Sequence, residues 1–244
     1  MNTSAITFAQ VTKKFRIPHE RRSTLREHFI GLFRPLTYEM FCAVDRMTIE
    51  VSKGEFLGVI GMNGSGKSTF LRLIAGIYPL HEGHISVQGR IAPFLELGAG
   101  FQPELSGREN IYLYAALLGL TRRQIHERYH AIVAYADMVR FMDQRVKNYS
   151  SGMQARLAFA ISIHVNADIL LVDEVLAVGD ADFQERCFET FRKLKKEGKT
   201  IIFVSHDLLE IKRFSNRVLW MDHGKIRMLG NPHQVVSDYE HTHV

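Results

Sequence analysis

One eight-residue segment constrains the fold of this chain more than any other feature. Residues 61–68 read Gly-Met-Asn-Gly-Ser-Gly-Lys-Ser, which satisfies the pattern G-x-x-x-x-G-K-[ST]. A continuous apolar run, residues 56–60, comes directly before the segment, and a helical pattern, residues 66–77, follows it. Glycines let such a loop direct several N–H groups at phosphate oxygens, and the helix adds the positive end of its dipole. The sequence therefore predicts a strand, a phosphate-binding loop and a helix in that order.

The residues of this loop have separate expected roles. We expect the Lys67 side chain to reach the β and γ phosphates of a nucleotide and the Ser68 hydroxyl to ligate Mg²⁺. The predicted nucleotide-contacting residues are Gly61, Asn63, Gly64, Ser65, Gly66, Lys67, Ser68 and Thr69. The alternative, a glycine-rich turn without a ligand, does not account for the placement of the lysine and the serine. The loop alone leaves kinases, GTPases, helicases and transport ATPases open.

Strands and helices alternate in the second half of the chain. Residues 169–172 and 200–204 are apolar runs typical of strands in a parallel sheet, and a helical pattern, residues 181–197, separates them. Residues 217–229 predict two short strands around a turn, and long helical patterns fill about residues 103–165. We therefore predict an α/β fold with a P-loop NTPase core, a mostly parallel sheet, an N-terminal antiparallel β part and a helical subdomain.

Polar residues at the ends of two predicted strands extend the site. Asp173 and Glu174 follow an apolar run, and parallel sheets place ligands at this end of their strands. We expect Asp173 to hold Mg²⁺ through water and Glu174 to orient or deprotonate an attacking water molecule. His206 follows the next strand, where it could hydrogen-bond a γ-phosphate or serve a structural role. The predicted catalytic residues are therefore Lys67, Asp173, Glu174 and His206.

A further motif lies between the two phosphate-site strands. Residues 149–156 read Tyr-Ser-Ser-Gly-Met-Gln-Ala-Arg and lead into an apolar helix. With this motif the chain resembles the ATP-binding subunit of ABC transporters from end to end, with a Walker A loop, a signature, a Walker B strand, a D-loop ending at Asp180 and a switch histidine. The resemblance implies ATP and Mg²⁺ as cofactors and a homodimer. It also implies that the signature residues Ser150, Ser151 and Gly152 of one chain contact the ATP held by the other, as a bare helix N-terminus suits an anion.

The signature departs from the usual Leu-Ser-Gly-Gly-Gln in a way that indicates one branch of the family. Tyr-Ser-Ser-Gly-Met is similar to the version in exporters of bacterial cell-surface polysaccharide, namely O-antigen, capsule and teichoic acid. An insertion at about residues 17–41 is typical of the same branch. So are the runs Phe-Leu-Glu-Leu-Gly-Ala-Gly-Phe (94–101), Pro-Glu-Leu-Ser-Gly-Arg-Glu-Asn (103–110) and Asp-Glu-Val-Leu-Ala-Val-Gly-Asp (173–180).

This resemblance implies a function. We expect an ATP-hydrolysing subunit that powers export of a lipid-linked cell-surface polysaccharide and is peripheral on the cytoplasmic face of the cytoplasmic membrane. Its expected partners are a second copy of itself and two copies of a transmembrane permease. Some members carry a C-terminal carbohydrate-binding domain, which we do not expect here because the sequence ends at Val244. An exporter of another substrate, such as a lipid or a drug, and a soluble ABC ATPase are the alternatives.

Two further site positions depend on the resemblance. Phe15 stands where the family places an aromatic ring against adenine, and a core aromatic at a strand end is the alternative. The Q-loop, which senses the γ-phosphate and contacts the membrane partner, has two candidate residues. Glu96 is indicated by counting back from residues 106–110, and Gln102 by its residue type.

Composition limits the classes of partner. The net charge of +5 is the excess of seven basic over two acidic residues in residues 1–35, so the rest of the chain is balanced. A nucleic-acid partner is disfavoured, because such proteins usually spread cationic charge over a groove. No apolar run reaches the roughly 18 to 20 residues of a membrane span, and two cysteines form no disulfide framework. Part of this basic excess lies in the insertion, at Arg21, Arg22 and Arg26. We expect these residues to face the phosphates of lipids or of the substrate. The alternative is a solvated helix that packs on the core.

Overall fold

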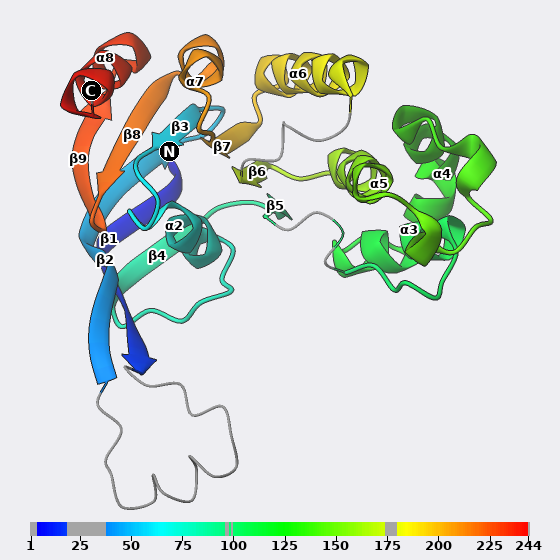
Figure 1. Ribbon diagram of the computed structural model, residues 1–244, viewed down its shortest axis with the longest axis horizontal. Coiled ribbons are helices and arrows are strands. Elements are labelled where there is room, and N and C mark those ends of the chain that lie inside the picture. Colours follow the sequence, from blue (N-terminus) through cyan, green and yellow to red (C-terminus); the bar gives the residue numbers. More distant parts are fainter. Residues whose placement is uncertain (1–3, 19–37, 96–97, 99, 174–179, 244) are drawn as a thin grey trace, which may run out of the picture.

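The computed structural model describes residues 4–18, 38–95, 98, 100–173 and 180–243. The predicted site residues Arg21, Arg22, Arg26, Glu96 and Glu174 lie outside these described residues, as do residues 177–179 of the D-loop. Figure 1 shows two β-sheets with their covering helices on one side of the molecule and a lobe of helices set off from them on the other. The predicted α/β fold with a helical subdomain is confirmed.

A six-stranded sheet forms the centre of the larger part. Its strand order is β5-β6-β7-β3-β8-β9, in which the first five strands run parallel and β9 is antiparallel to β8. The strands are β3 (Phe56–Ile60), β5 (Ile91–Phe94), β6 (Ile169–Asp173), β7 (Thr200–Val204), β8 (Arg217–Asp222) and β9 (Lys225–Gly230). All strands predicted from apolar runs in this part of the sequence are therefore present.

Both faces of this sheet are covered, which explains why its strands are unbroken apolar runs. Successive side chains of a strand point to opposite faces, so Val172 packs in one core and Leu171 in the other. Helices α6 (Ala181–Lys196), α7 (Leu208–Phe214) and α8 (Pro232–His243) close the first core. Helix α2 (Lys67–Ile74) and a second sheet close the other core. Helix α2 is shorter than the pattern over residues 66–77 predicts, because Gly76 adopts a φ of 70° just after it.

The second sheet is antiparallel and contains the N-terminal strand. Its order is β2-β1-β4, with β1 (Ser4–Pro18), β2 (Tyr38–Ser52) and β4 (Glu82–Val87). Strands β1 and β2 are each 15 residues long, and they remain paired as far as Pro18 with Tyr38. Residues 17–18 and 38–41, at the two ends of the insertion predicted at about residues 17–41, therefore belong to these strands. The paired strands extend to the lower left of Figure 1.

The helical lobe lies between β5 and β6 in the sequence. It contains α3 (Gly107–Leu117), α4 (Arg122–Ala136), the 3₁₀ turns η2 (Val139–Phe141) and η3 (Val146–Asn148), and α5 (Ser151–Ile163). Capping boxes begin α3 at Ser106 and α4 at Thr121. The lobe has its own apolar core, while Phe159 of α5 packs in the core of the large sheet and so joins the two parts. None of the described helices is long and apolar enough to cross a membrane.

Candidate functional site

The phosphate-binding loop lies between the end of β3 and the start of α2. Gly61 and Gly66 have φ angles of 149° and 106°, which glycine adopts without strain. A Cβ atom on Gly61 would lie 2.3 Å from the Met221 carbonyl oxygen, and one on Gly66 would lie 2.3 Å from the Ala43 carbonyl oxygen. The loop passes this close to the backbones of β8 and β2 because it has no side chains at these two positions.

Replacing Gly66 with alanine is expected to lower the free energy of unfolding by about 2 to 4 kcal/mol, since the new methyl group meets both a strained backbone and a carbonyl oxygen. Denaturant unfolding measures this change. Gly64→Ala is the matched control, because Gly64 also has a positive φ of 79° but a Cβ there meets nothing within 4 Å. Equal losses of unfolding free energy in the two variants would show that the contact with the Ala43 carbonyl oxygen is not what makes alanine unfavourable at position 66.

The loop holds the Lys67 ammonium over its own backbone. The Nζ atom donates to the carbonyl oxygens of Gly61 at 2.7 Å and Met62 at 3.1 Å, and the side chain is buried. Gly66 is the N-cap of α2, so no side chain caps the first N–H groups of this helix. The buried Ser65 hydroxyl has no hydrogen-bond partner among the described residues. A fixed cation, helix N–H groups without a side-chain cap and an unsatisfied hydroxyl around one loop fit a polyphosphate.

Asp173 and His206 lie at the same edge of the sheet as this loop. Val59 of β3 pairs with Val204 of β7, and Val204 pairs with Asp173 of β6. His206 follows the end of β7 by two residues, and the loop containing Lys67 follows the end of β3. Asp173 is half-buried and His206 is exposed. The structure therefore brings together three of the four predicted catalytic residues at the carboxyl edge of a parallel sheet, where phosphates and ions bind.

The turn that carries His206 is fixed by the start of α7. Asp207 is the N-cap, and its Oδ1 accepts from the N–H groups of Leu209 at 2.8 Å and Glu210 at 3.2 Å. The Ser205 hydroxyl donates to Glu210 Oε2 at 3.1 Å and accepts from the Asp207 N–H at 3.0 Å. Burial raises the pKa of Glu210, although its bond from Ser205 acts in the opposite direction. His206 is thus flanked by hydrogen-bonded residues on both sides.

The signature forms the N-terminus of α5 on the helical lobe. Ser150 is the N-cap, and its Oγ accepts from the Met153 N–H at 3.2 Å. Ser150 and Ser151 are exposed, and Gly152 is half-buried. Within one chain the signature therefore belongs to the lobe, whereas the phosphate-binding loop belongs to the sheets.

Tyr149, which stands where the usual signature has leucine, anchors this segment. The side chain is buried, and its hydroxyl donates to the Phe141 carbonyl oxygen at 2.6 Å. A Cβ on Gly107 would lie 2.1 Å from the same hydroxyl oxygen, so the ring packs closely on the start of α3. Burial raises the pKa of Tyr149 to about 12. The departure from leucine at this position therefore has a structural reason, a bond that leucine cannot make.

Removing this hydroxyl tests the anchor. Tyr149→Phe is expected to lower the free energy of unfolding by about 1 to 2 kcal/mol, because the Phe141 carbonyl loses its donor while the ring still packs. Urea unfolding monitored by circular dichroism gives the value. Tyr38→Phe is the control, since Tyr38 is 43% exposed and its change should stay within about 0.5 kcal/mol. An unchanged stability for Tyr149→Phe would contradict the anchoring role.

Asp180, at the end of the D-loop, joins α5 to α6. It is the N-cap of α6, with Oδ1 accepting the Phe183 N–H at 3.1 Å, and it forms an ion pair with Arg156 of α5. The Arg156 guanidinium also lies over the Phe183 ring, 5.1 Å from its centroid. The bond from Phe183, followed by that from Arg156, lowers the pKa of Asp180. The signature helix and the end of the D-loop are thus connected within one chain.

Phe15 lies in β1 and is half-buried. Its ring stands edge-on to Tyr78, with the centroids 5.3 Å apart. The Lys13 ammonium lies 4.9 Å from the Phe15 centroid and donates to the Pro79 carbonyl oxygen at 3.0 Å. Phe15 therefore has an aromatic partner in its own chain, and its role toward adenine stays a prediction.

Of the two Q-loop candidates, only Gln102 is described. Its side chain is exposed, whereas its backbone N–H and C=O are both bonded to the side chain of Asn110, which is fully buried in α3. The sequence pattern does not predict the bonds of Asn110 to Gln102, of Tyr149 to Phe141 or of Arg156 to Asp180. The only local signal near Asn110 is the capping-box spacing of Ser106 and Glu109, which indicates where α3 begins but not what its first turns hold.

A groove of about 410 Å³ lies between the helical lobe and the sheets. Arg72, Tyr78 and Leu95 line it from the sheet part, and Tyr114 and Leu118 line it from the lobe. Most of these side chains are apolar or aromatic. Because its walls come from both parts of the molecule, anything seated in this groove touches both.

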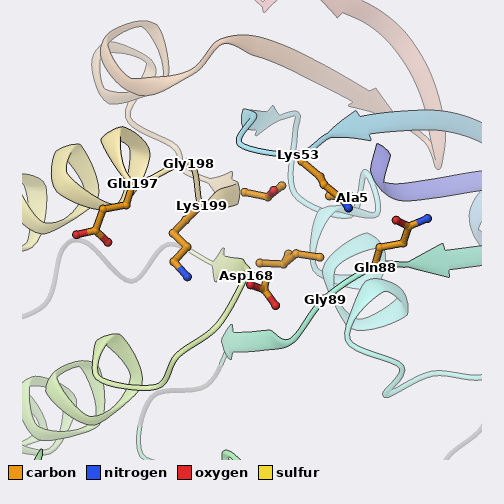
Figure 2. A pocket seen from close by; sticks show the side chains of 10 residues that line it. Ala5, Lys53, Gln88, Gly89, Asp168, Glu197, Gly198 and Lys199 are labelled. Atoms are coloured by element: carbon orange, nitrogen blue, oxygen red, sulfur yellow. The ribbon is translucent and has the colours of Figure 1, made fainter. Parts of the chain in front are cut away.

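Another cavity, of about 450 Å³, lies at the opposite edge of the large sheet (Figure 2). Its lining includes Lys53, Asp168 and Lys199, which precede the starts of β3, β6 and β7. The Asp168 carboxylate there accepts the Arg90 N–H at 2.9 Å. Parallel strands begin at the edge opposite to the one where they end, so this cavity is separate from the phosphate site.

Two features together define the class of ATP-binding cassettes. One is a mostly parallel sheet with a glycine-rich loop at its carboxyl edge, and the other is a serine-capped helix on a separate lobe. The fold is similar to that of the ATP-binding cassette MJ0796, solved as a dimer bound to ADP and Pi, with a TM-score of 0.75 and 21% identity over 93% of this chain and 98% of that one. The family model for ABC transporter matches residues 44–177.

Two relatives resemble the chain over nearly its whole length. The O-antigen export system ATP-binding protein RfbB of Klebsiella pneumoniae is 41% identical over 238 residues, which are 96% of this chain and 97% of that protein. The teichoic acids export ATP-binding protein TagH of Bacillus anthracis is 39% identical over 96% of this chain and 42% of that protein. The chain belongs to the ABC transporter family and is an ABC ATPase, which confirms the predicted family.

Proposed function

We propose that this ATPase powers the export of a lipid-linked cell-surface polysaccharide across the cytoplasmic membrane through a separate permease. The observation that carries the proposal is the match, at 41% identity over 97% of its length, to an O-antigen export subunit. The Tyr-Ser-Ser-Gly-Met signature favours the same class of substrate. In this proposal the chain is peripheral and lies at the cytoplasmic face.

The loop and its lysine bind the triphosphate of ATP. The Lys67 ammonium, fixed by two loop carbonyls, faces the β and γ phosphates and stabilises the charge that develops on the transferred phosphoryl group. Glu174 orients the attacking water and accepts its proton, His206 hydrogen-bonds the γ-phosphate, and Phe15 packs against adenine. The remaining loop contacts are Gly61, Asn63, Gly64, Ser65, Gly66, Ser68 and Thr69.

Ser68 and Asp173 would hold Mg²⁺. A hydroxyl and a carboxylate are oxygen donors of the kind this ion prefers, and both side chains are half-buried at the phosphate edge of the sheet. When bound, the ion neutralises negative charge on the phosphates.

Two copies of the chain complete the ATP sites. Ser150 and Ser151 are exposed on the lobe, and Met62, Asn63 and Gly64 are exposed at the tip of the loop. A head-to-tail pair of chains places the N-terminus of α5 of one copy against the ATP of the other, where its N–H groups meet the γ-phosphate.

The permease docks in the groove between the lobe and the sheets. Ile77 lines this groove, and Leu117, the last residue of α3, precedes the lining residue Leu118. The two side chains are 55% and 66% exposed. Exposed apolar side chains beside an apolar groove favour a protein partner. Two grooves in the dimer accommodate two copies of the permease.

Copurification and a deletion strain test the proposal together. The tagged chain, expressed in its source cell, is expected to bring down a polytopic membrane protein from detergent-solubilised membranes. Deletion of its gene is expected to remove polysaccharide from the cell surface and to leave lipid-linked polymer inside, with recovery on complementation. Normal surface polysaccharide would indicate an exporter of another substrate. Recovery of ribosomes or DNA in place of a membrane protein would indicate a soluble ABC ATPase.

A further inference from the structure

Asn110 is a polar side chain with no exposed surface, in the first turns of α3. Its Oδ1 accepts the Gln102 N–H at 2.7 Å. Its Nδ2 shares two hydrogens among three carbonyl oxygens, those of Gln102 at 3.0 Å, Ser106 at 3.0 Å and Leu105 at 3.2 Å. One carboxamide therefore closes residues 102–106 onto α3.

Few side chains could make this set of bonds. A carboxamide supplies an acceptor and two donor hydrogens, whereas aspartate lacks the donors and leucine has neither. Because a buried polar group costs free energy unless it is hydrogen-bonded, an amide at this position depends on the backbone that it holds. Conversely, the Gln102 N–H depends on the amide of Asn110, whereas the Gln102 carbonyl oxygen also accepts the Leu105 N–H at 3.1 Å.

Residues 103–107 also run beside residues 142–147, and we call these two segments the lobe ladder. Three backbone hydrogen bonds of 2.9 to 3.0 Å join the two segments: Val146 N–H to Leu105 O, Lys147 N–H to Pro103 O, and Gly107 N–H to Gln144 O. A fourth, from the adjacent Arg108 N–H to Met142 O at 2.9 Å, continues the series. Glu104 adds ion pairs to Arg145 at 3.2 Å and to Lys147 at 3.0 Å. Exposed ion pairs contribute little, so the backbone bonds hold the ladder together.

The lobe ladder ends at the signature. The Tyr149 N–H donates to the Val146 carbonyl oxygen at 2.9 Å, and its hydroxyl donates to the Phe141 carbonyl oxygen at 2.6 Å. Ser150, the next residue, is the N-cap of α5. Val146 is the shared residue, because its N–H donates to the Leu105 carbonyl oxygen and its own carbonyl oxygen accepts the Tyr149 N–H. A displacement of residues 102–107 therefore reaches Ser150 through Val146 and Tyr149.

The groove lies at the other end of this connection. Gly100 precedes Gln102 by two residues, Tyr114 follows Asn110 by four, and both Gly100 and Tyr114 line the groove. Residues four apart in a helix share a face. A Cβ on Gly100 would lie 2.9 Å from the Tyr114 ring, so the two residues form one piece of the groove wall. This piece of the wall is connected to Asn110 in two ways, through Gln102, which follows Gly100 by two residues, and through α3, which carries both Asn110 and Tyr114.

We propose that Asn110 is a positioning residue that makes the groove wall, the lobe ladder and the signature move as one body. A displacement of the wall then reaches Ser150 and Ser151 and couples the groove to closure of the signature over ATP. The coupling rests on the proposed function, in which the permease occupies the groove. Asn110 acts through the backbone that it holds, because its side chain is fully buried.

Hydrogen–deuterium exchange of the purified chain tests the one-body connection without a permease. In Asn110→Ala, amide exchange is expected to rise by about tenfold at residues 102–107 and at residues 145–149 together, because both sets open as one unit. The control Thr121→Ala removes the N-cap of α4 and should raise exchange in α4 alone. A rise at residues 102–107 with residues 145–149 unchanged would overturn the proposal. If Asn110→Ala does not fold, Asn110→Ser, whose neutral hydroxyl keeps one donor and an acceptor at this site, is expected to give the same pattern with a smaller rise.

ATP turnover tests the coupling itself. The ratio of turnover with the copurified permease to turnover of the chain alone is expected to fall about 3- to 30-fold in Asn110→Ala, with the KM for ATP unchanged. The Thr121→Ala control should keep the wild-type ratio. An equal loss of turnover with and without the permease, or a raised KM, would overturn the positioning role. Absence of any stimulation in the wild type would instead count against the proposed function, and the exchange pattern would still decide whether Asn110 joins the ladder to the groove wall.

Discussion

ATP turnover is expected to fall by about 10²- to 10³-fold when Lys67 is replaced by alanine, the loss typical of removing one preorganised charge-stabilising donor. Lys67 is 6% exposed, so its charge acts where water screens it weakly. The bonds to Gly61 O and Met62 O hold the ammonium over the loop before ATP arrives. Steady-state turnover at saturating ATP gives the loss, and a fluorescent ATP analogue gives the accompanying loss of affinity.

Lys53→Ala is the matched control for this variant. Lys53 lies in the cavity at the opposite edge of the sheet, so its removal changes the net charge equally without touching the phosphate site. Its turnover should stay within about twofold of the wild type, consistent with weak, screened effects of a distant exposed charge. Both variants are compared by thermal unfolding. Near-wild-type turnover in a folded Lys67→Ala protein would contradict the role assigned to the lysine.

Replacing Glu174 with glutamine is expected to preserve ATP binding, to trap an ATP-bound dimer and to lower turnover by about 10²- to 10⁴-fold. Glutamine keeps the shape of the side chain but cannot accept a proton from water. Glu174 itself lies outside the described residues, and the expectation rests on its neighbour Asp173, which ends β6 at the phosphate edge. Size-exclusion chromatography with and without ATP detects the dimer.

Glu197→Gln provides the comparison for Glu174→Gln. Glu197 is exposed and lines the cavity at the far edge of the sheet, so the same chemical change there should alter neither dimerisation nor turnover. Unchanged turnover of Glu174→Gln, measured with the membrane partner present, would show that Glu174 is not the catalytic base. Loss of ATP binding in that variant would point to a structural role for the carboxylate.

The sheet side of the site could be predicted because each of its signals is local. The pattern of the phosphate-binding loop includes the strand before it and the helix after it, and both are present. The apolar runs that end at Asp173 and before His206 identify strands covered on both faces. Parallel strands covered in this way share one carboxyl edge, so the chain order alone placed Lys67, Asp173 and His206 together.

The lobe side could not be predicted in the same way, because its contacts join residues distant in the sequence. The ion pair of Arg156 and Asp180 spans 24 residues, and the contact of Glu104 with Arg145 spans 41. The bond from Tyr149 to Phe141 crosses a 3₁₀ turn whose packing no periodic pattern specifies. The pairing of β1 and β2 as far as Pro18 with Tyr38 is equally non-local, because no short sequence pattern records which residue of one strand faces which residue of the other.

By itself, then, the sequence predicted a phosphate-binding loop, its acidic strand end and a signature, and it determined the family to which they belong. Only the tertiary structure decided how the signature is held, through the Tyr149 hydroxyl, the Asn110 carboxamide and the lobe ladder. The physical reason is that ligand-binding loops are specified by backbone conformation and short spacing, which sequence patterns record. Coupling between two parts depends on side chains satisfying backbone groups across a packed core, which only the folded chain brings within hydrogen-bonding distance.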